Sequence, residues 1–115
     1  MTVFGPTHYV WRPDVAALVR RFETRYATKA NNYEGHGEEP SREPRSVDFW
    51  ALSGRGWPIP TRTGSAIFKR LRRRQGAPQY EYIIWRGYVY PRGGSRFRYG
   101  DASDQHFDHV HVTFV

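Results

Sequence analysis

The chain has 115 residues, which is enough for one small domain with a modest core. Eighteen basic and eleven acidic residues give a formal net charge of +7, which indicates an anionic partner such as nucleic acid, an acidic membrane or a wall polymer. No cysteine is present, which excludes disulfides and thiolate metal sites, and no apolar run has the length of a membrane span. Residues 1–6 lack the pattern of a signal peptide.

A helix is expected over residues 14–27. Pro13 suits its first turn, and Val15, Leu18 and Phe22 are among the apolar residues that recur at helical spacing. Residues 31–45 are rich in Gly, Pro and polar residues, and they indicate a loop whose length is typical of functional loops. A short strand is predicted directly after it, over residues 46–51.

The second half of the chain predicts another helix and more strands. Thr63 or Ser65 is expected to cap a helix with an apolar stripe, and Gly76 is expected to stop it. Residues 80–85 and 88–90 flank Arg86-Gly87, a pattern typical of a β-hairpin, and residues 91–104 indicate a polar loop. This order predicts one α+β domain over residues 1–115, with a small antiparallel sheet flanked by two to three helices.

Three of the five histidines lie near the C-terminus: His106, His109 and His111. A β-branched run follows, so this segment is expected to form a strand in which alternate side chains share a face. His109 and His111 would then project together, with Val110 and Val112 turned toward the core. Two such imidazoles make half of a metal site. The alternative is a polar sheet edge whose histidines only form hydrogen bonds.

Asp48 is the carboxylate that best completes such a site. It lies in the otherwise apolar segment Val47-Asp48-Phe49-Trp50, where a buried carboxylate is costly unless it is paired or bound to a metal. The alternative is that Asp48 faces solvent on an alternating strand. His36, in the preceding glycine-bearing loop, is the natural third ligand.

Four segments together resemble the zinc peptidases of the D-alanyl-D-alanine carboxypeptidase group, and more narrowly a small actinobacterial and phage-associated branch of it. The resemblance covers roughly residues 10 to 115 and is carried by residues 31–36, 46–50, 82–85 and 106–112. It implies the fold shared with lysostaphin-type and hedgehog-type domains, a small antiparallel sheet flanked by helices.

The resemblance also implies roles for particular residues. A single Zn2+ would be held by His36, Asp48 and His111, with Asp108 as the general base and His109 and His106 assisting catalysis. One departure concerns the first ligand, because the commoner family spacing falls on Ser41, and His36 fits only with a five-residue insertion in the loop. If Ser41 is the true equivalent, the domain has lost its metal and its activity.

The implied reaction is hydrolysis of an amide bond in peptidoglycan stem peptides or cross-bridges, by a monomer that works outside the cell or in its envelope. Arg45 lies near the ligand loop and is a candidate to hold a substrate carboxylate. Trp85 is a candidate to line a substrate groove. A structural arginine and a core tryptophan are the alternatives.

Three other functions remain open. Residues 69–74 and 92–99 interleave basic and aromatic side chains, which is typical of non-specific binding to nucleic acid or another polyanion. A metal-binding or wall-binding domain without catalysis follows if Ser41 has replaced the first ligand. His111-Val112-Thr113 has the form used by two-histidine phosphoesterases, but these need a second copy that the sequence lacks.

Overall fold

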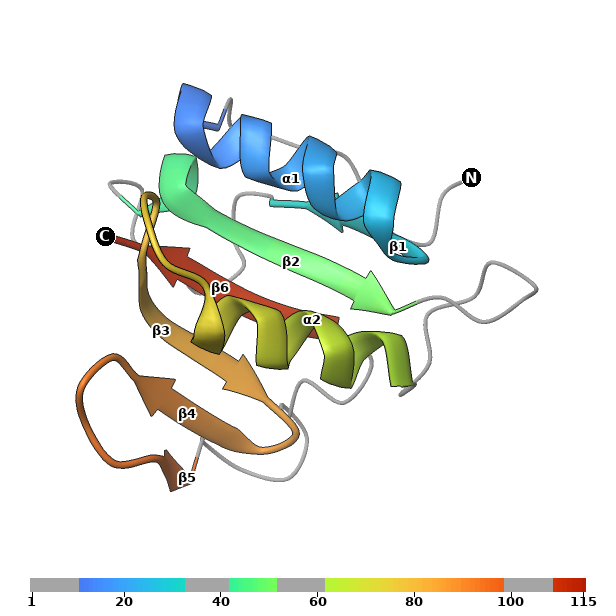
Figure 1. Cartoon of the computed structure of the whole chain (residues 1–115). Helices are drawn as coiled ribbons and strands as arrows, with labels where there is room; N and C mark the ends of the chain where they lie inside the picture. Colours follow the sequence, from blue (N-terminus) through green and yellow to red (C-terminus); the bar gives the residue numbers. More distant parts are fainter. Residues whose placement is uncertain (1–10, 33–41, 52–61, 99–108) are drawn as a thin grey trace.

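The computed structural model describes residues 11–32, 42–51, 62–98 and 109–115, and it confirms the predicted α+β class (Figure 1). Two α-helices are present in these ranges, α1 (Pro13–Arg25) and α2 (Arg62–Arg73), together with one 3-10 turn, η1 (Glu43–Arg45). The strands are β1 (Thr28–Asn31), β2 (Ser46–Ala51), β3 (Tyr80–Trp85), β4 (Tyr88–Pro91), β5 (Phe97–Arg98) and β6 (His109–Phe114). No described helix is long and apolar enough to cross a membrane.

The six strands form one antiparallel sheet in the order β1-β2-β6-β3-β4-β5. The histidine strand β6 therefore lies inside the sheet, between β2 and β3 (Figure 1). The interpretation of this segment as a polar edge is wrong. A central strand is paired along both sides, so its side chains are held more rigidly than those of an edge.

Helix α1 forms where the periodicity predicts it, with Pro13 in its first turn. It ends two residues before the expected position, because Tyr26 is extended and the chain turns directly into β1. Val15, Leu18 and Phe22 are among its buried residues, as the apolar spacing indicates.

Helix α2 begins at Arg62, so the prediction that Thr63 or Ser65 caps it is wrong: both lie inside its first turns. Gly64 is required in that turn by the packing of the sheet. A Cβ at this position would lie 2.5 Å from the end of the Trp85 indole, so the small residue lets helix and strand approach closely.

The predicted hairpin is confirmed. Arg86 and Gly87 both have positive φ, 52° and 87°, which is the type I′ geometry that matches the twist of the flanking strands. Strand β1 lies between the end of the first expected helix and the start of the first expected loop, and β5 lies within the second expected loop. Both are short, and their pairing with β2 and β4 decides their conformation.

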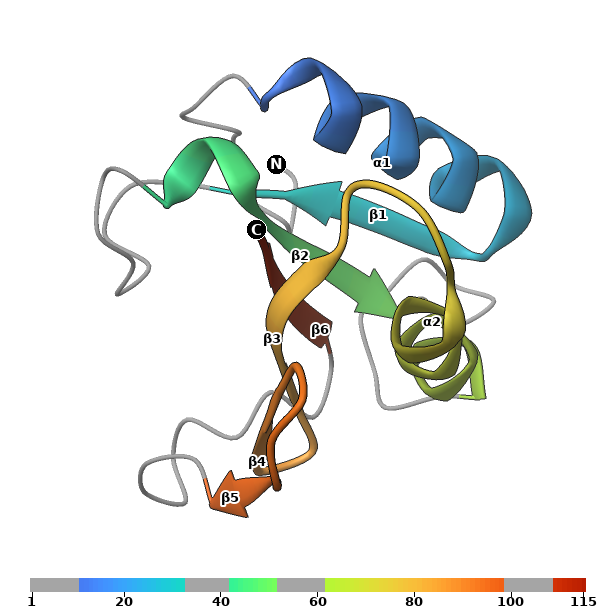
Figure 2. The same ribbon diagram turned by 60° about the vertical axis from the view of Figure 1, so that its left-hand side comes forward.

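Both helices contribute to a single apolar cluster on one face of the sheet (Figures 1 and 2). β2 contributes Val47 and Phe49 to this cluster, and β6 contributes Val110, Val112 and Phe114. The alternate residues of these strands point to the opposite face. That face carries the residues predicted to bind metal.

Candidate functional site

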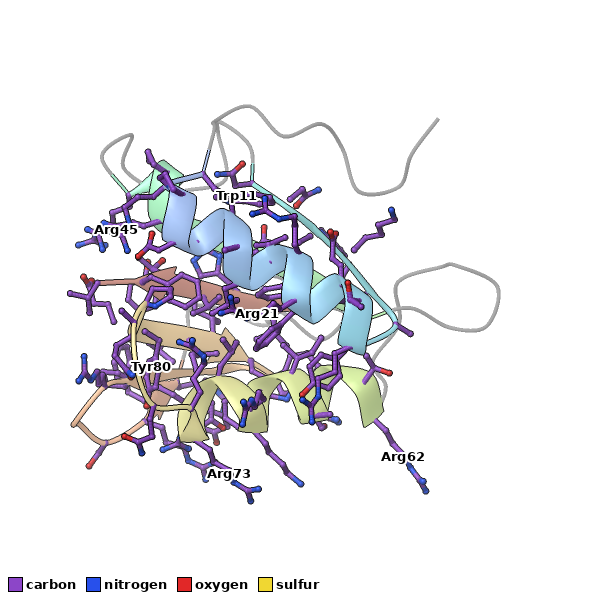
Figure 3. The ribbon with its side chains drawn as sticks, turned by 45° about the horizontal axis from the view of Figure 1, so that its top comes forward. Trp11, Arg21, Arg45, Arg62, Arg73 and Tyr80 are labelled. Atoms are coloured by element: carbon purple, nitrogen blue, oxygen red, sulfur yellow. The ribbon has the colours of Figure 1, made fainter. Side chains whose placement is uncertain are left out.

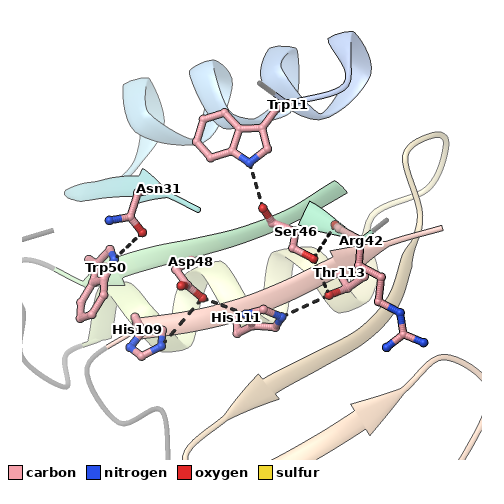
Figure 4. A network of polar contacts seen from close by, with 9 residues as sticks. All are labelled: Trp11, Asn31, Arg42, Ser46, Asp48, Trp50, His109, His111 and Thr113. Atoms are coloured by element: carbon pink, nitrogen blue, oxygen red, sulfur yellow. Dashed lines mark hydrogen bonds and ion pairs between the residues drawn. The ribbon is translucent and has the colours of Figure 1, made fainter. Parts of the chain in front are cut away.

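The site lies where β2 and β6 pair in the middle of the sheet. Their register places Asp48 directly opposite His111, and Trp50 opposite His109. On the outer side Asn31 of β1 faces Asp48, and on the inner side Ile84 of β3 faces His111. Residues directly opposite one another share a face, so one row crosses four strands. Figure 4 views this face, with α2 behind the strands.

Asp48 and His111 form a buried pair. His111 Nδ1 lies 2.8 Å from Asp48 Oδ1, and the two residues are 2% and 1% exposed respectively. The alternative in which Asp48 faces solvent is therefore wrong. A carboxylate at this depth is costly unless it is paired or bound to a metal, and the His111 imidazole on the neighbouring strand lies within hydrogen-bond distance of it.

His109 lies beside this pair on the same face, as the alternation predicts. Its Nε2 is 3.8 Å from the same Asp48 oxygen, and its side chain is 12% exposed. The imidazole packs on the indole of Trp50, with ring centroids 4.3 Å apart. Trp50 Nε1 in turn donates a hydrogen bond to Asn31 Oδ1 at 3.1 Å. His109 is thus the more accessible of the two histidines, and its ring plane is supported from β1.

The far side of His111 is also held. Its Nε2 lies 3.1 Å from Thr113 Oγ1, which lies 3.0 Å from Ser46 Oγ, and Ser46 donates to the carbonyl of Arg42 at 2.9 Å (Figure 4). The Tyr82 ring stacks on His111 nearly parallel, at 5.9 Å between centroids.

Sequence reasoning missed three of these neighbours. Ser46 and Thr113 follow the same alternation that places Asp48 and His111 on one face, so extending that pattern by one step would have found them. Strand alternation gave no such signal for Asn31, because it was expected to begin the loop of residues 31–45 and no strand was predicted before it.

The donors fit part of a zinc site. A carboxylate oxygen and an imidazole nitrogen are ligands that zinc takes, and the second nitrogen of His111 is held by a hydroxyl, as outer-shell groups hold metal-ligating histidines. Within the described ranges, no group of three His, Asp or Glu residues is placed to hold a metal ion. The predicted third ligand His36, its alternative Ser41, the base Asp108, and His106 lie outside the described residues.

The two predicted substrate-binding residues have other surroundings. Trp85 is 3% exposed and packs in the apolar cluster against Gly64, on the face opposite the histidines, which corrects its predicted place in a groove. Arg45 donates to the Phe114 carbonyl at 2.6 Å and contacts Glu81 at 3.1 Å. These contacts brace the ends of three strands and argue against a substrate contact.

Many basic residues lie in α2 and in the segment that follows it. Residues 62–98 contain ten Arg and Lys residues and one acidic residue, Glu81, and Arg62 and Arg73 extend outward from α2 (Figure 3). Arg72 lies 5.2 Å from the centre of the Tyr90 ring, and Arg96 lies 4.4 Å from that of Tyr88. A hydrogen bond with Tyr90 raises the pKa of Arg96.

Neither a family model, nor a curated protein, nor a solved structure matches this chain. The assignment of a function therefore depends on the geometry above and on the resemblance in the sequence.

Proposed function

We propose that this chain is a zinc-dependent peptidase that hydrolyses an amide bond in peptidoglycan stem peptides or cross-bridges. One observation carries the proposal. Asp48 and His111, two of the three ligands that the resemblance implies, lie opposite one another on adjacent central strands with their ligand atoms 2.8 Å apart.

The burial of this pair favours a functional reading. A buried ion pair is often no more stabilising than apolar residues of similar volume, and the reverse faces of the same strands are fully apolar. A fold that needed only stability at this point would gain as much from two aliphatic side chains. The polar pair, with its supporting hydrogen bonds, is the arrangement expected of a ligand set.

Asp48, His111 and, by the resemblance, His36 would hold the metal. When bound, zinc would supply a Lewis acid that activates water and polarises the scissile carbonyl. Asp108 would accept the proton of the attacking water and pass it to the leaving amine. His109 lies next to Asp48 and is the more exposed histidine, so it would donate a hydrogen bond to the developing oxyanion, with His106 as a further donor.

The first experiment measures zinc content and wall hydrolysis together. Purified protein should contain one zinc per chain and release amino groups from peptidoglycan, and a chelator should abolish the release until zinc is restored. His36→Ala and Asp48→Asn should each lose both properties. Asp14→Asn is the matched control, because Asp14 lies in the first turn of α1, away from the site, and forms an exposed ion pair with Arg12.

Three results separate the alternatives. Zinc bound by the wild type without cleavage of any wall preparation supports the non-catalytic metal-binding domain. A wild type that binds no zinc and cleaves nothing would overturn the proposal. Loss of zinc in Asp48→Asn but not in His36→Ala would exclude His36 as the third ligand while keeping the metal centre.

The contacts of Arg72 with Tyr90 and of Arg96 with Tyr88 support a second candidate function, which is binding to single-stranded nucleic acid. Arginine planes stacked on Tyr88 and Tyr90 offer both phosphate contacts and stacking surfaces. A salt titration with single-stranded DNA tests it, using a double variant, Arg72→Gln with Arg96→Gln. Binding that survives moderate salt and falls in the double variant supports this function, and weak binding lost at moderate salt excludes it.

A further inference from the structure

We propose that Ser46 and Thr113 are positioning residues that keep the proton of His111 on Nε2 and direct the Nδ1 lone pair at Asp48. The carbonyl of Arg42 sets the direction of this chain of hydrogen bonds. The part of the proposal that concerns metal binding rests on the proposed function. The part that concerns the His111 tautomer does not.

The direction of these hydrogen bonds is fixed by the Arg42 carbonyl, which is the group of this hydrogen-bonded chain farthest from His111. A backbone carbonyl only accepts hydrogen bonds, so the 2.9 Å contact between Ser46 Oγ and Arg42 O uses the single hydroxyl hydrogen of Ser46. Ser46 must then accept in its other contact. The 3.0 Å contact with Thr113 Oγ1 is therefore donated by Thr113.

The same count of hydroxyl hydrogens decides which ring nitrogen of His111 carries the proton. Thr113 has one hydroxyl hydrogen, and Ser46 receives it, so Thr113 Oγ1 accepts in its 3.1 Å contact with His111 Nε2. The donor must be the Nε2–H of the imidazole. Three groups, the Arg42 carbonyl before η1, Ser46 on β2 and Thr113 on β6, thus specify which ring nitrogen carries a proton.

Burial protects these hydrogen bonds. Ser46, Thr113 and His111 are each at most 2% exposed, so bulk water does not compete for these hydrogens. Ser46 is also anchored from the segment just before α1, because Trp11 Nε1 donates to the Ser46 carbonyl at 2.8 Å. Tyr82 stacks along the imidazole and restricts its rotation. Both the orientation of the His111 ring and its tautomer are therefore fixed.

This tautomer has a consequence for the other ring nitrogen of His111, Nδ1, which faces Asp48. With Nε2 protonated, Nδ1 presents its lone pair to Asp48 Oδ1 at 2.8 Å, and two electron-rich atoms at that distance need a positive charge between them. A divalent ion meets this need and so does a shared proton. A histidine that is already in the ligand tautomer avoids the reorganisation that metal binding otherwise requires.

The test combines nitrogen-15 NMR of the histidine rings with zinc affinity. Thr113→Val keeps the shape of the side chain but removes the hydroxyl, and Thr113→Ser keeps the hydroxyl. Ser46→Ala leaves Thr113 in place but removes its acceptor, so the threonine hydrogen is free to turn toward Nε2. Thr28→Val is the matched control, since Thr28 is a buried strand threonine that donates to the Trp50 carbonyl instead. Urea unfolding confirms that each variant is folded.

In the wild type, the slowly exchanging ring proton of His111 should be on Nε2 in both metal-free and zinc-loaded protein, with zinc on Nδ1. Thr113→Val and Ser46→Ala should each lose that slow exchange and bind zinc about 10–100-fold more weakly, the usual cost of removing an outer-shell partner. Thr113→Ser and Thr28→Val should match the wild type.

A slowly exchanging proton on Nδ1 instead of Nε2, or unchanged exchange and zinc affinity in both Thr113→Val and Ser46→Ala, would overturn the proposal. Failure of the wild type to bind zinc overturns the proposed function alone. In that event the metal-free spectra of the wild type, Thr113→Val and Ser46→Ala still decide the tautomer.

Discussion

The two faces of β2 and β6 are built from neighbouring residues, yet they differ completely in chemistry. Val47, Phe49, Val110 and Val112 point into the apolar cluster under the helices. The residues between them, on the other face, are polar and nearly as buried: Ser46, Asp48, His111 and Thr113. Both sets of residues are buried, but only one set is wholly apolar.

This difference shows how one register serves both folding and chemistry. Because side chains alternate along a strand, the apolar face that fixes the pairing of β2 with β6 also fixes Asp48 opposite His111. A shift of one residue would place the polar pair under the helices and the valines on the site. The hydrophobic core therefore determines the geometry of the polar pair, and the two faces are expected to respond differently to substitution.

The largest expected effect comes from the apolar face. Phe49 is fully buried and its ring lies 5.3 Å from that of Phe22, so Phe49→Ala should lower the free energy of unfolding by about 3–5 kcal/mol through lost contacts and a residual cavity. Urea unfolding followed by circular dichroism measures this. Lys29→Ala, an exposed change on β1, should stay within about 0.5 kcal/mol. A loss below about 1 kcal/mol for Phe49→Ala would contradict the assignment of this face as the core.

The adjacent residue tests the polar face. Asp48→Asn keeps the shape of the side chain but removes its charge, and we expect zinc affinity to fall at least about 100-fold, or about 2.7 kcal/mol. Isothermal titration calorimetry with zinc measures it, and the far-ultraviolet spectrum should not change. An unchanged affinity together with an intact fold would mean that Asp48 is not a ligand.

Much of this architecture could be predicted from local patterns. The helix that begins at Pro13 has a proline in its first turn and apolar residues at helical spacing. Arg86-Gly87 specifies a tight hairpin, because both residues of that turn need a positive φ. The joint projection of His109 and His111 follows from strand alternation alone. These features were predictable because each depends on neighbours in the sequence.

The features that were missed depend on distant partners. Thr28–Asn31 forms a strand only because β2 offers it an edge, and nothing in Thr-Lys-Ala-Asn favours that conformation strongly. Trp85 was expected near a substrate, yet the space above Gly64, 21 positions earlier in the sequence, draws it into the core. The link between Arg45 and the Phe114 carbonyl likewise joins residues 69 positions apart.

A further prediction concerns Arg45, which directly precedes β2 and contacts the ends of β3 and β6. Its side chain is 24% exposed, so Arg45→Met should lower the free energy of unfolding by about 1–2 kcal/mol, mainly through the lost hydrogen bond to Phe114. Under the proposed function, KM for wall fragments should not change. A raised KM with unchanged stability would restore the predicted substrate contact.

The smallest expected effect concerns Gly64, and it sharpens the placement of Trp85. Gly64→Ala gains about 1 kcal/mol of helix propensity, but its Cβ meets the indole of a buried tryptophan at 2.5 Å, and such overpacking costs about 1–3 kcal/mol. We therefore expect a net loss of about 1 kcal/mol by urea unfolding. Combining it with Trp85→Phe, which shortens the ring, should cost less than the sum of the two single changes, because they act on one contact. Strict additivity would mean that the two residues do not touch, and it would return Trp85 to consideration as a residue of the open face.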